Sequence, residues 1–219
     1  MTLPDLLLQI AYGKLAWGVV LATLVAALLP ASRQLSRRAT ALLLGSMVVL
    51  TLLPGQFSPA YWIALALQWP SGLLVGLCLA RLAQPWWPAS ARAVLPPTLA
   101  SAIALLGTIL YLDALGLVSL GLYFWGFGPR GAPLFALAAM ALCVAWIIQG
   151  RSRPQAFATL GALTLFTLLR LPTGNLWDAL LDPMLWIWAV LSLAIEAWRK
   201  RERNLATNNI NQGVVSGKS

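Results

Sequence analysis

Histidine is absent from this 219-residue chain, and only 10% of its residues are charged. Without histidine the chain lacks the ligand of most haem and catalytic zinc sites, and the usual acid or base near neutral pH. A soluble domain carries roughly 25% charged residues, which keep its surface hydrated. This chain cannot cover a surface that faces water, so a soluble globular fold is excluded.

Cysteine is also scarce, and Cys78 and Cys143 both lie inside apolar runs. Two thiols without histidine or a nearby carboxylate offer too few ligands for a closed metal site. We expect two buried side chains that form neither a disulfide nor a metal centre. The sequence also contains no catalytic or nucleotide-binding motif, and we assign it no catalytic residue, metal or cofactor.

Apolar residues make up 60% of the chain and occur in long runs that short turns separate. A helix needs about 20 mostly apolar residues to cross a bilayer. The sequence therefore predicts an all-α polytopic transmembrane helix bundle of seven spans, with six as the alternative. The seven runs are residues 12–29, 39–53, 60–82, 93–112, 132–149, 155–171 and 182–198.

Basic residues favour seven spans, because with that number four basic groups fall on one side of the membrane. The groups are Arg33, Arg37 and Arg38; Arg81 and Arg92; Arg151 and Arg153; and the cluster from Arg199 to Arg203. The positive-inside rule then places the N-terminus outside and the C-terminus in the cytoplasm. Basic loops that face anionic lipid account for the net charge of +9, so we expect no nucleic-acid partner.

The first run resembles a secretory signal, because an apolar stretch follows Lys14 near its start and small residues come after it. The arginines directly after the run oppose export of that end, so we expect a retained helix. Compact loops with a strong charge asymmetry are typical of bacterial membrane proteins, and we expect a multi-pass protein of the bacterial inner (plasma) membrane.

Two segments depart from the pattern of spans and short turns. Residues 115–131 are too apolar for a plain loop yet rich in glycine. We expect either an interfacial or re-entrant hairpin, or an extension of the fourth helix past Asp113. From residue 204 onward the chain is polar and lacks aromatic residues, which predicts a disordered cytoplasmic tail. The predicted division is a transmembrane bundle at 1–203 and a tail at 204–219.

Ionisable residues near span ends are candidate functional residues, because unpaired charge in lipid is costly. Five of them fall on the predicted outer side: Asp113, Arg130, Arg170, Asp178 and Asp182. Together they could form a pocket for a headgroup, a sugar or an ion, and Asp178 and Asp182 would share a face if both were helical. Alternatively, Asp182 caps the last helix, and Arg170 pairs with Asp178.

A second candidate lies inside the third run, at Gln68, Pro70 and Ser71. Proline removes a helix hydrogen bond, and Ser71 with Gly72 favours a kink. In transporters a broken helix with a polar side chain at the membrane midplane is a usual substrate site. In a packing role, Gln68 would bond a neighbouring helix instead. Gly72 and Gly76 allow a close helix contact, either within the chain or with a partner.

The leading hypothesis is a non-enzymatic membrane subunit or accessory factor of a bacterial cell-envelope machine, because buried polar groups and motifs are few. Its expected partners are the lipid bilayer and other membrane subunits. Anionic lipid is expected at Arg199, Lys200, Arg201 and Arg203. One alternative is a small-solute or lipid-linked-glycan transporter that uses the Gln68 region. The other is an intramembrane transferase or hydrolase that uses the outer-side aspartates with a divalent cation.

Overall fold

The computed structural model describes residues 4–29, 35–86, 93–150 and 153–216. Every regular element within these ranges is a helix, so the predicted all-α class is confirmed. The elements are α1 (Leu6–Leu28), α2 (Arg37–Leu52), η1 (Gly55–Phe57), α3 (Pro59–Leu67), α4 (Gly72–Leu82), α5 (Pro97–Ala114), α6 (Leu122–Trp125), α7 (Gly131–Ile148), α8 (Arg153–Leu169), α9 (Leu176–Leu180) and α10 (Pro183–Ser216).

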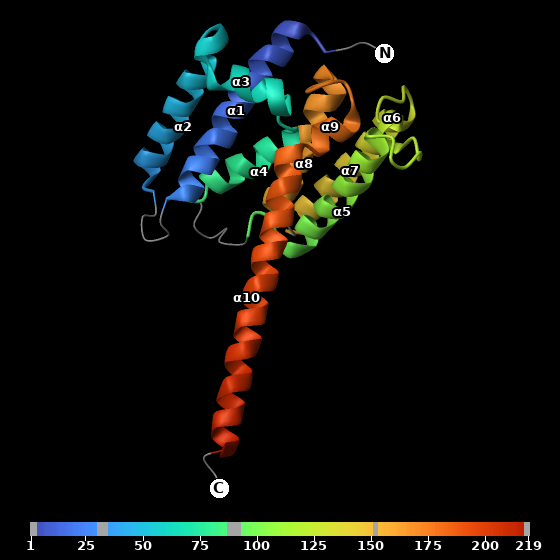
Figure 1. Cartoon of the computed structure of the whole chain (residues 1–219). Coiled ribbons are helices and arrows are strands. Elements are labelled where there is room, and N and C mark those ends of the chain that lie inside the picture. Colours follow the sequence, from blue (N-terminus) through green and yellow to red (C-terminus); the bar gives the residue numbers. More distant parts are fainter. Residues whose placement is uncertain (1–3, 30–34, 87–92, 151–152, 217–219) are drawn as a thin grey trace.

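The long helices run alternately in opposite directions, so their connections gather at two ends of a bundle (Figure 1). One end, which we call the basic end, carries Arg37, Arg38, Arg81, Arg153 and the 199–203 cluster of α10. The opposite end, which we call the acidic end, carries Asp5, Asp113 and Asp178. Arg33, Arg92 and Arg151, which the sequence also places with the basic groups, lie outside the described residues.

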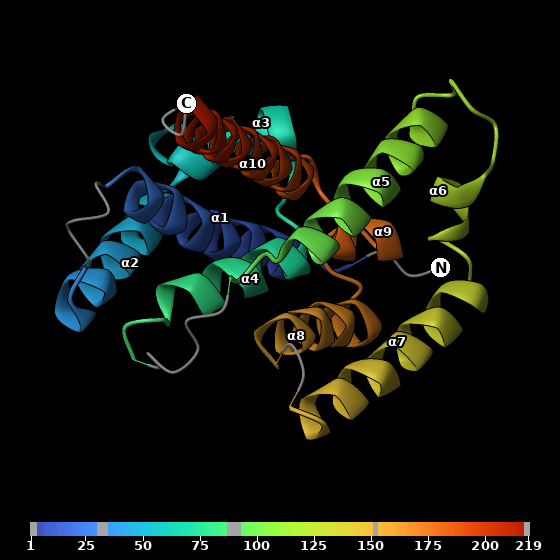
Figure 2. The same ribbon diagram turned by 90° about the horizontal axis from the view of Figure 1, so that it is seen from below.

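Side-chain hydrogen bonds tie the connections of the basic end together. Arg37 Nε donates to the carbonyl oxygen of Pro85 at 3.0 Å, and Gln155 Nε2 donates to that of Val94 at 2.8 Å. These bonds join the starts of α2 and α8 to the segment between α4 and α5. Seen from this end, α4 lies between α1 and α8 (Figure 2), while α2 packs on α1, α7 on α8 and α5 on α10.

Helix starts follow capping residues and prolines. Asp5 accepts the N–H of Leu7 at 2.9 Å, and Ser36 accepts that of Ala39 at 3.2 Å, so both side chains satisfy donors that a helix start leaves open. The helices α3, α5 and α10 each begin with a proline, whose missing N–H costs nothing in the first turn. The boundaries of the bundle are therefore set largely by local sequence.

The helix bounds differ from the predicted apolar runs at three points. α1 begins at Leu6, six residues before the start of the first predicted run at residue 12. α5 ends at Ala114 and the short α6 follows, so the fourth helix does not continue through residues 115–131. α10 includes residues 204–216, which composition predicts to be disordered. A packed helix can propagate into such a segment because it needs no new nucleus.

Among the described residues, three helices are long and apolar enough to cross a membrane: Leu6–Leu28, Pro97–Ala114 and Gly131–Ile148. In the apolar window of α7 only 17% of the residues are buried. Leu134 and Ile148 of this helix are 66% and 78% exposed. Large apolar side chains on an outward face are favourable in lipid and unfavourable in water, so these helices are compatible with membrane insertion.

Small residues let α4 and α8 approach each other closely. A Cβ atom built on Gly76 would lie 2.7 Å from the Cα and Cβ atoms of Ala158, and one on Gly72 would lie 2.8 Å from those of Ala162. The two pairs have the same four-residue spacing, which brings one side of each helix into contact. The predicted small-residue contact therefore forms within the chain.

This contact predicts that Gly76→Ala destabilises the bundle. The added methyl group would overlap backbone and side-chain atoms of Ala158, which costs about 1–3 kcal/mol and lowers the unfolding temperature by about 2–12 °C. Thermal unfolding of the detergent-solubilised protein measures the shift. Gly161→Ala is the matched control, because nothing lies within 4 Å of the Cβ position there. Equal unfolding temperatures for the two variants would contradict the close contact.

Candidate functional site

Asp182 is buried at the point where α4 and α10 begin, and its carboxylate accepts hydrogen bonds from both helix starts. Oδ2 accepts the backbone N–H of Ser71 at 2.7 Å, and Oδ1 accepts that of Leu185 at 2.8 Å. Ser71 immediately precedes α4, and Leu185 lies in the first turn of α10. The prediction that Asp182 caps the last helix is confirmed, and the same side chain also caps α4.

The third run is interrupted between α3 and α4, as the proline predicts. Gln68 adopts a left-handed φ of 58°, and the carbonyl groups around the break lose their helical partners. Two side chains of α1 replace those partners: Tyr12 Oη donates to the oxygen of Pro70 at 2.8 Å, and Trp17 Nε1 donates to that of Gln68 at 3.1 Å. Donors of α1 thus satisfy the carbonyls of the break, and Asp182 accepts the N–H of Ser71 at its end.

Sequence reasoning missed both donors. A proline break inside an apolar run frees carbonyl oxygens, and these need donors from neighbouring spans. Tyr12 and Trp17, both in the first run, each carry a hydrogen-bond donor on a large aromatic side chain that can reach such a carbonyl. Their presence in that run was the available signal, although the contacts join residues 58 and 51 positions apart.

The proposed pathway residues occupy different surroundings at the break. Pro70 and Ser71 are fully buried, and the Ser71 hydroxyl accepts the N–H of Leu74 at 3.1 Å, which makes it a cap of α4. The side chain of Gln68 is exposed on the surface of the bundle. The backbone of Gln68, rather than its amide, therefore takes part in the junction.

Asp178 organises a second group of polar side chains at the acidic end. Tyr123 Oη donates to its Oδ1 at 3.1 Å, and Thr173 Oγ1 donates to its Oδ2 at 2.5 Å. The buried Asn175 donates through Nδ2 to the backbone oxygen of Tyr123 at 3.2 Å. These bonds fasten α6 to α9, which are far apart in sequence.

Burial controls the protonation of this group. Desolvation raises the pKa of the Asp178 carboxyl above its ordinary value, and the bonds from Thr173 and Tyr123 oppose that rise. Burial, together with the charge of Asp178, raises the pKa of Tyr123 to about 12. Tyr123 therefore stays protonated at neutral pH, as it must to donate to the carboxylate.

Asp113 shapes the turn that follows α5. Its Oδ1 accepts the backbone N–H groups of Leu120 and Gly121 at 2.8 and 2.9 Å, and its Oδ2 accepts that of Tyr123 at 2.8 Å. One carboxylate thus holds the turn and the start of α6. The same residue, Tyr123, contacts Asp113 through its backbone and Asp178 through its hydroxyl.

The two arginines of the predicted outer cluster stand apart from these carboxylates. Arg130 is exposed immediately before α7. The guanidinium of Arg170 lies 5.2 Å from the centre of the Phe166 ring, a cation–π contact. The predicted ion pair between Arg170 and Asp178 is wrong for this structure, because Asp178 is bonded to Thr173 and Tyr123 instead.

The three aspartates therefore have separate sets of donors. Asp178 lies within α9, whereas Asp182 follows the end of that helix at Leu180, so the two do not share one helical face. Within residues 4–29, 35–86, 93–150 and 153–216, no group of three or more acidic or cysteine side chains could hold a metal ion. The chemistry of this arrangement is the capping of helix and turn ends.

Comparison of the chain with protein-family models, with curated proteins and with solved structures finds no match. The functional interpretation therefore rests on the chain's own chemistry.

The geometry predicts that Asp182→Ala strongly destabilises the protein. The change leaves two N–H groups, those of Ser71 and Leu185, without an acceptor in an apolar interior, which costs roughly 2–6 kcal/mol. Asp5→Ala is the matched control, because Asp5 also accepts two backbone N–H groups but is exposed; its loss costs about 1 kcal/mol. Unfolding of both variants in detergent gives the comparison. Similar small losses would contradict the double cap.

Proposed function

We propose that the chain is a non-enzymatic integral membrane protein, a subunit or accessory factor of a bacterial cell-envelope machine. One observation supports this most directly: each of the six Asp and Glu side chains either accepts a hydrogen bond from another group of the chain or forms an ion pair with one. The acceptors are Asp5, Asp113, Asp178 and Asp182 at helix and turn ends, Glu196 with Lys200, and Glu202 with Trp198. Each carboxylate thus has a structural partner within the chain, so capping or ion pairing accounts for its presence without a substrate or ligand.

In this proposal the chain crosses the inner membrane seven times. The crossings are α1, α2, the interrupted pair α3 and α4, α5, α7, α8 and α10. The alternating helix directions and the shared basic end support this topology, because cytoplasmic loops carry an excess of arginine and lysine. The N-terminus lies outside, the C-terminus lies in the cytoplasm, and the acidic end faces outward.

The expected partners follow from the outward surface of the bundle. Exposed leucines such as Leu105 (64%) and Leu134 (66%) supply apolar faces for lipid or for other membrane subunits. At the basic end of the bundle, Arg199, Lys200, Arg201 and Arg203 of α10 are the expected contacts for anionic lipid. No soluble domain is needed for these contacts.

A small-solute transporter is the second candidate, and the interrupted helix favours it. Transporters often place substrate where a helix breaks and its ends point at a charged group. Here the start of α4 points at Asp182, next to Gln68, Pro70 and Ser71. The N–H of Ser71 and the carbonyl oxygens of Gln68 and Pro70 already have hydrogen-bond partners in the chain, which favours a fixed structural junction over a substrate site.

The topology predicts opposite compartments for the two ends of the chain. Alkaline phosphatase should be active when it is fused to the N-terminus and inactive when it is fused after residue 203. Green fluorescent protein should be dark at the N-terminus and fluorescent after residue 203. Fusions after Gly128 and after Gln84 act as internal controls for the acidic and basic ends. Both ends in the same compartment would reject the odd number of crossings.

The accessory role predicts that the protein purifies from native membranes as a stoichiometric complex and that the isolated chain conducts no solute in proteoliposomes. Gln68→Leu should leave abundance, complex formation and growth unchanged, because its side chain is exposed. Size-exclusion chromatography with light scattering and a flux assay measure these properties. A stable monomer whose solute flux disappears in Gln68→Leu would replace this proposal with the transporter.

A further inference from the structure

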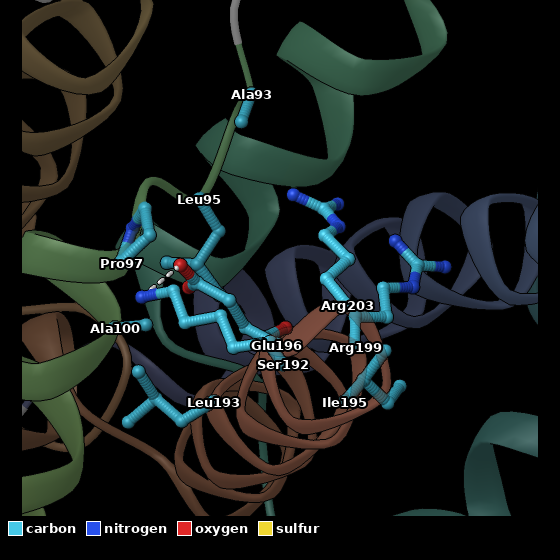
Figure 3. Close-up of a pocket in the computed structure, with 11 residues that line it drawn as sticks. Ala93, Leu95, Pro97, Ala100, Ser192, Leu193, Ile195, Glu196, Arg199 and Arg203 are labelled. Atoms are coloured by element: carbon cyan, nitrogen blue, oxygen red, sulfur yellow. Dashed lines mark ion pairs between the residues drawn. The ribbon is translucent and has the colours of Figure 1, made fainter. Parts of the chain in front are cut away.

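A hollow with a volume of about 280 Å³ lies at the basic end, between the segment at 93–97 and α10 (Figure 3). Its size is close to the lower limit of small-ligand pockets, roughly 300–1,000 Å³. The lining is apolar at Leu95, Ala100 and Leu193, among others. It is basic at Arg199, Lys200 and Arg203, which all come from α10.

The charge of the lining favours an anion. The lining carries three cationic side chains and one carboxylate, that of Glu196, which pairs with Lys200 at 2.9 Å. Pro97 at the start of α5 also lines the hollow, and the preceding Pro96 supplies no side-chain cap there. A helix start carries a partial positive charge, so it adds to the attraction that the arginines exert.

The lining of the hollow changes from mostly apolar to basic along the chain direction of α10. Its inner residues, Ser192 to Glu196, belong to the predicted seventh span at 182–198, whereas Arg199 to Arg203 follow that span. The eleven residue-to-residue steps from Ser192 to Arg203 cover about 16 Å along the helix, which reaches from the hydrocarbon edge into the headgroup layer. A ligand that matches both parts carries an apolar chain and a negative group.

We propose that this hollow binds the phosphate headgroup of an anionic phospholipid, with an acyl chain lying along Leu193 and Leu95. Arg199 and Arg203 hold the phosphate oxygens, and the pair of Glu196 and Lys200 lies beside them. Guanidinium groups suit phosphate because they donate two parallel hydrogen bonds. The proposal rests on the membrane topology of the proposed function and adds to it one defined lipid site.

The test titrates the full-length protein in detergent with phosphatidylglycerol and follows bound lipid by native mass spectrometry and stability by thermal unfolding. The double variant Arg199→Gln/Arg203→Gln should bind this lipid roughly 10–30-fold more weakly than the wild type. The variant Arg38→Gln/Arg153→Gln is the matched control: it removes the same charge at the basic end from exposed residues outside the lining. It should keep one tightly bound lipid.

Parallel arms use phosphatidylcholine and inorganic phosphate. Weak effects of both support the lipid site, whereas stabilisation by inorganic phosphate equal to that by phosphatidylglycerol overturns the assignment to lipid. Equal loss of binding in the two double variants also overturns it, because surface charge alone would then account for the affinity. The terminal reporters distinguish these outcomes from failure of the topology, since they do not depend on lipid binding.

Discussion

The carboxylate of Asp182 joins two helix starts that the chain places 111 residues apart. A helix that breaks inside an apolar bundle leaves backbone groups without water, and each unsatisfied group costs about 1–3 kcal/mol. Asp182 accepts the N–H at the end of this break, while Tyr12 and Trp17 donate to its carbonyl groups. The break between α3 and α4 is stable because α1 and α10 supply these partners, and so the four helices meet at one joint.

The position of this joint explains how α4 packs. The cap at Ser71 fixes the start of the helix, and the glycines that follow within two turns let it lie directly on α8. At the far end of α8, the backbone oxygen of Pro172 accepts a hydrogen bond from Gln9 of α1 at 2.6 Å. α1 is therefore linked to α4 and α8 by polar contacts near the acidic end, and α4 and α8 pack through small residues further toward the basic end.

Sequence reasoning reached what local chemistry determines. Proline and glycine marked the helix ends, Pro70 marked the break, and Asp182 followed by Pro183 marked a helix start, because each effect acts within one turn. Sequence reasoning did not identify the hydrogen-bond partners that lie on other helices of the bundle. Nothing in spacing links Tyr12 to Pro70, and Arg170 was paired with Asp178 on the basis of charge and proximity in sequence. In the structure Asp178 accepts hydrogen bonds from Tyr123 and Thr173 instead, because the turn after Asp113 brings Tyr123 close to Asp178.

The two ends of the bundle use charge in opposite ways. At the acidic end each carboxylate accepts hydrogen bonds from the chain's own groups and so stabilises helix and turn ends. At the basic end, exposed arginines such as Arg37, Arg81 and Arg153 outnumber the acids. Charges at a surface act over about 8 Å at physiological ionic strength, and the field of several cations there attracts anionic molecules. We therefore expect recognition of other molecules at the basic end, whereas the carboxylates of the acidic end serve contacts within the chain.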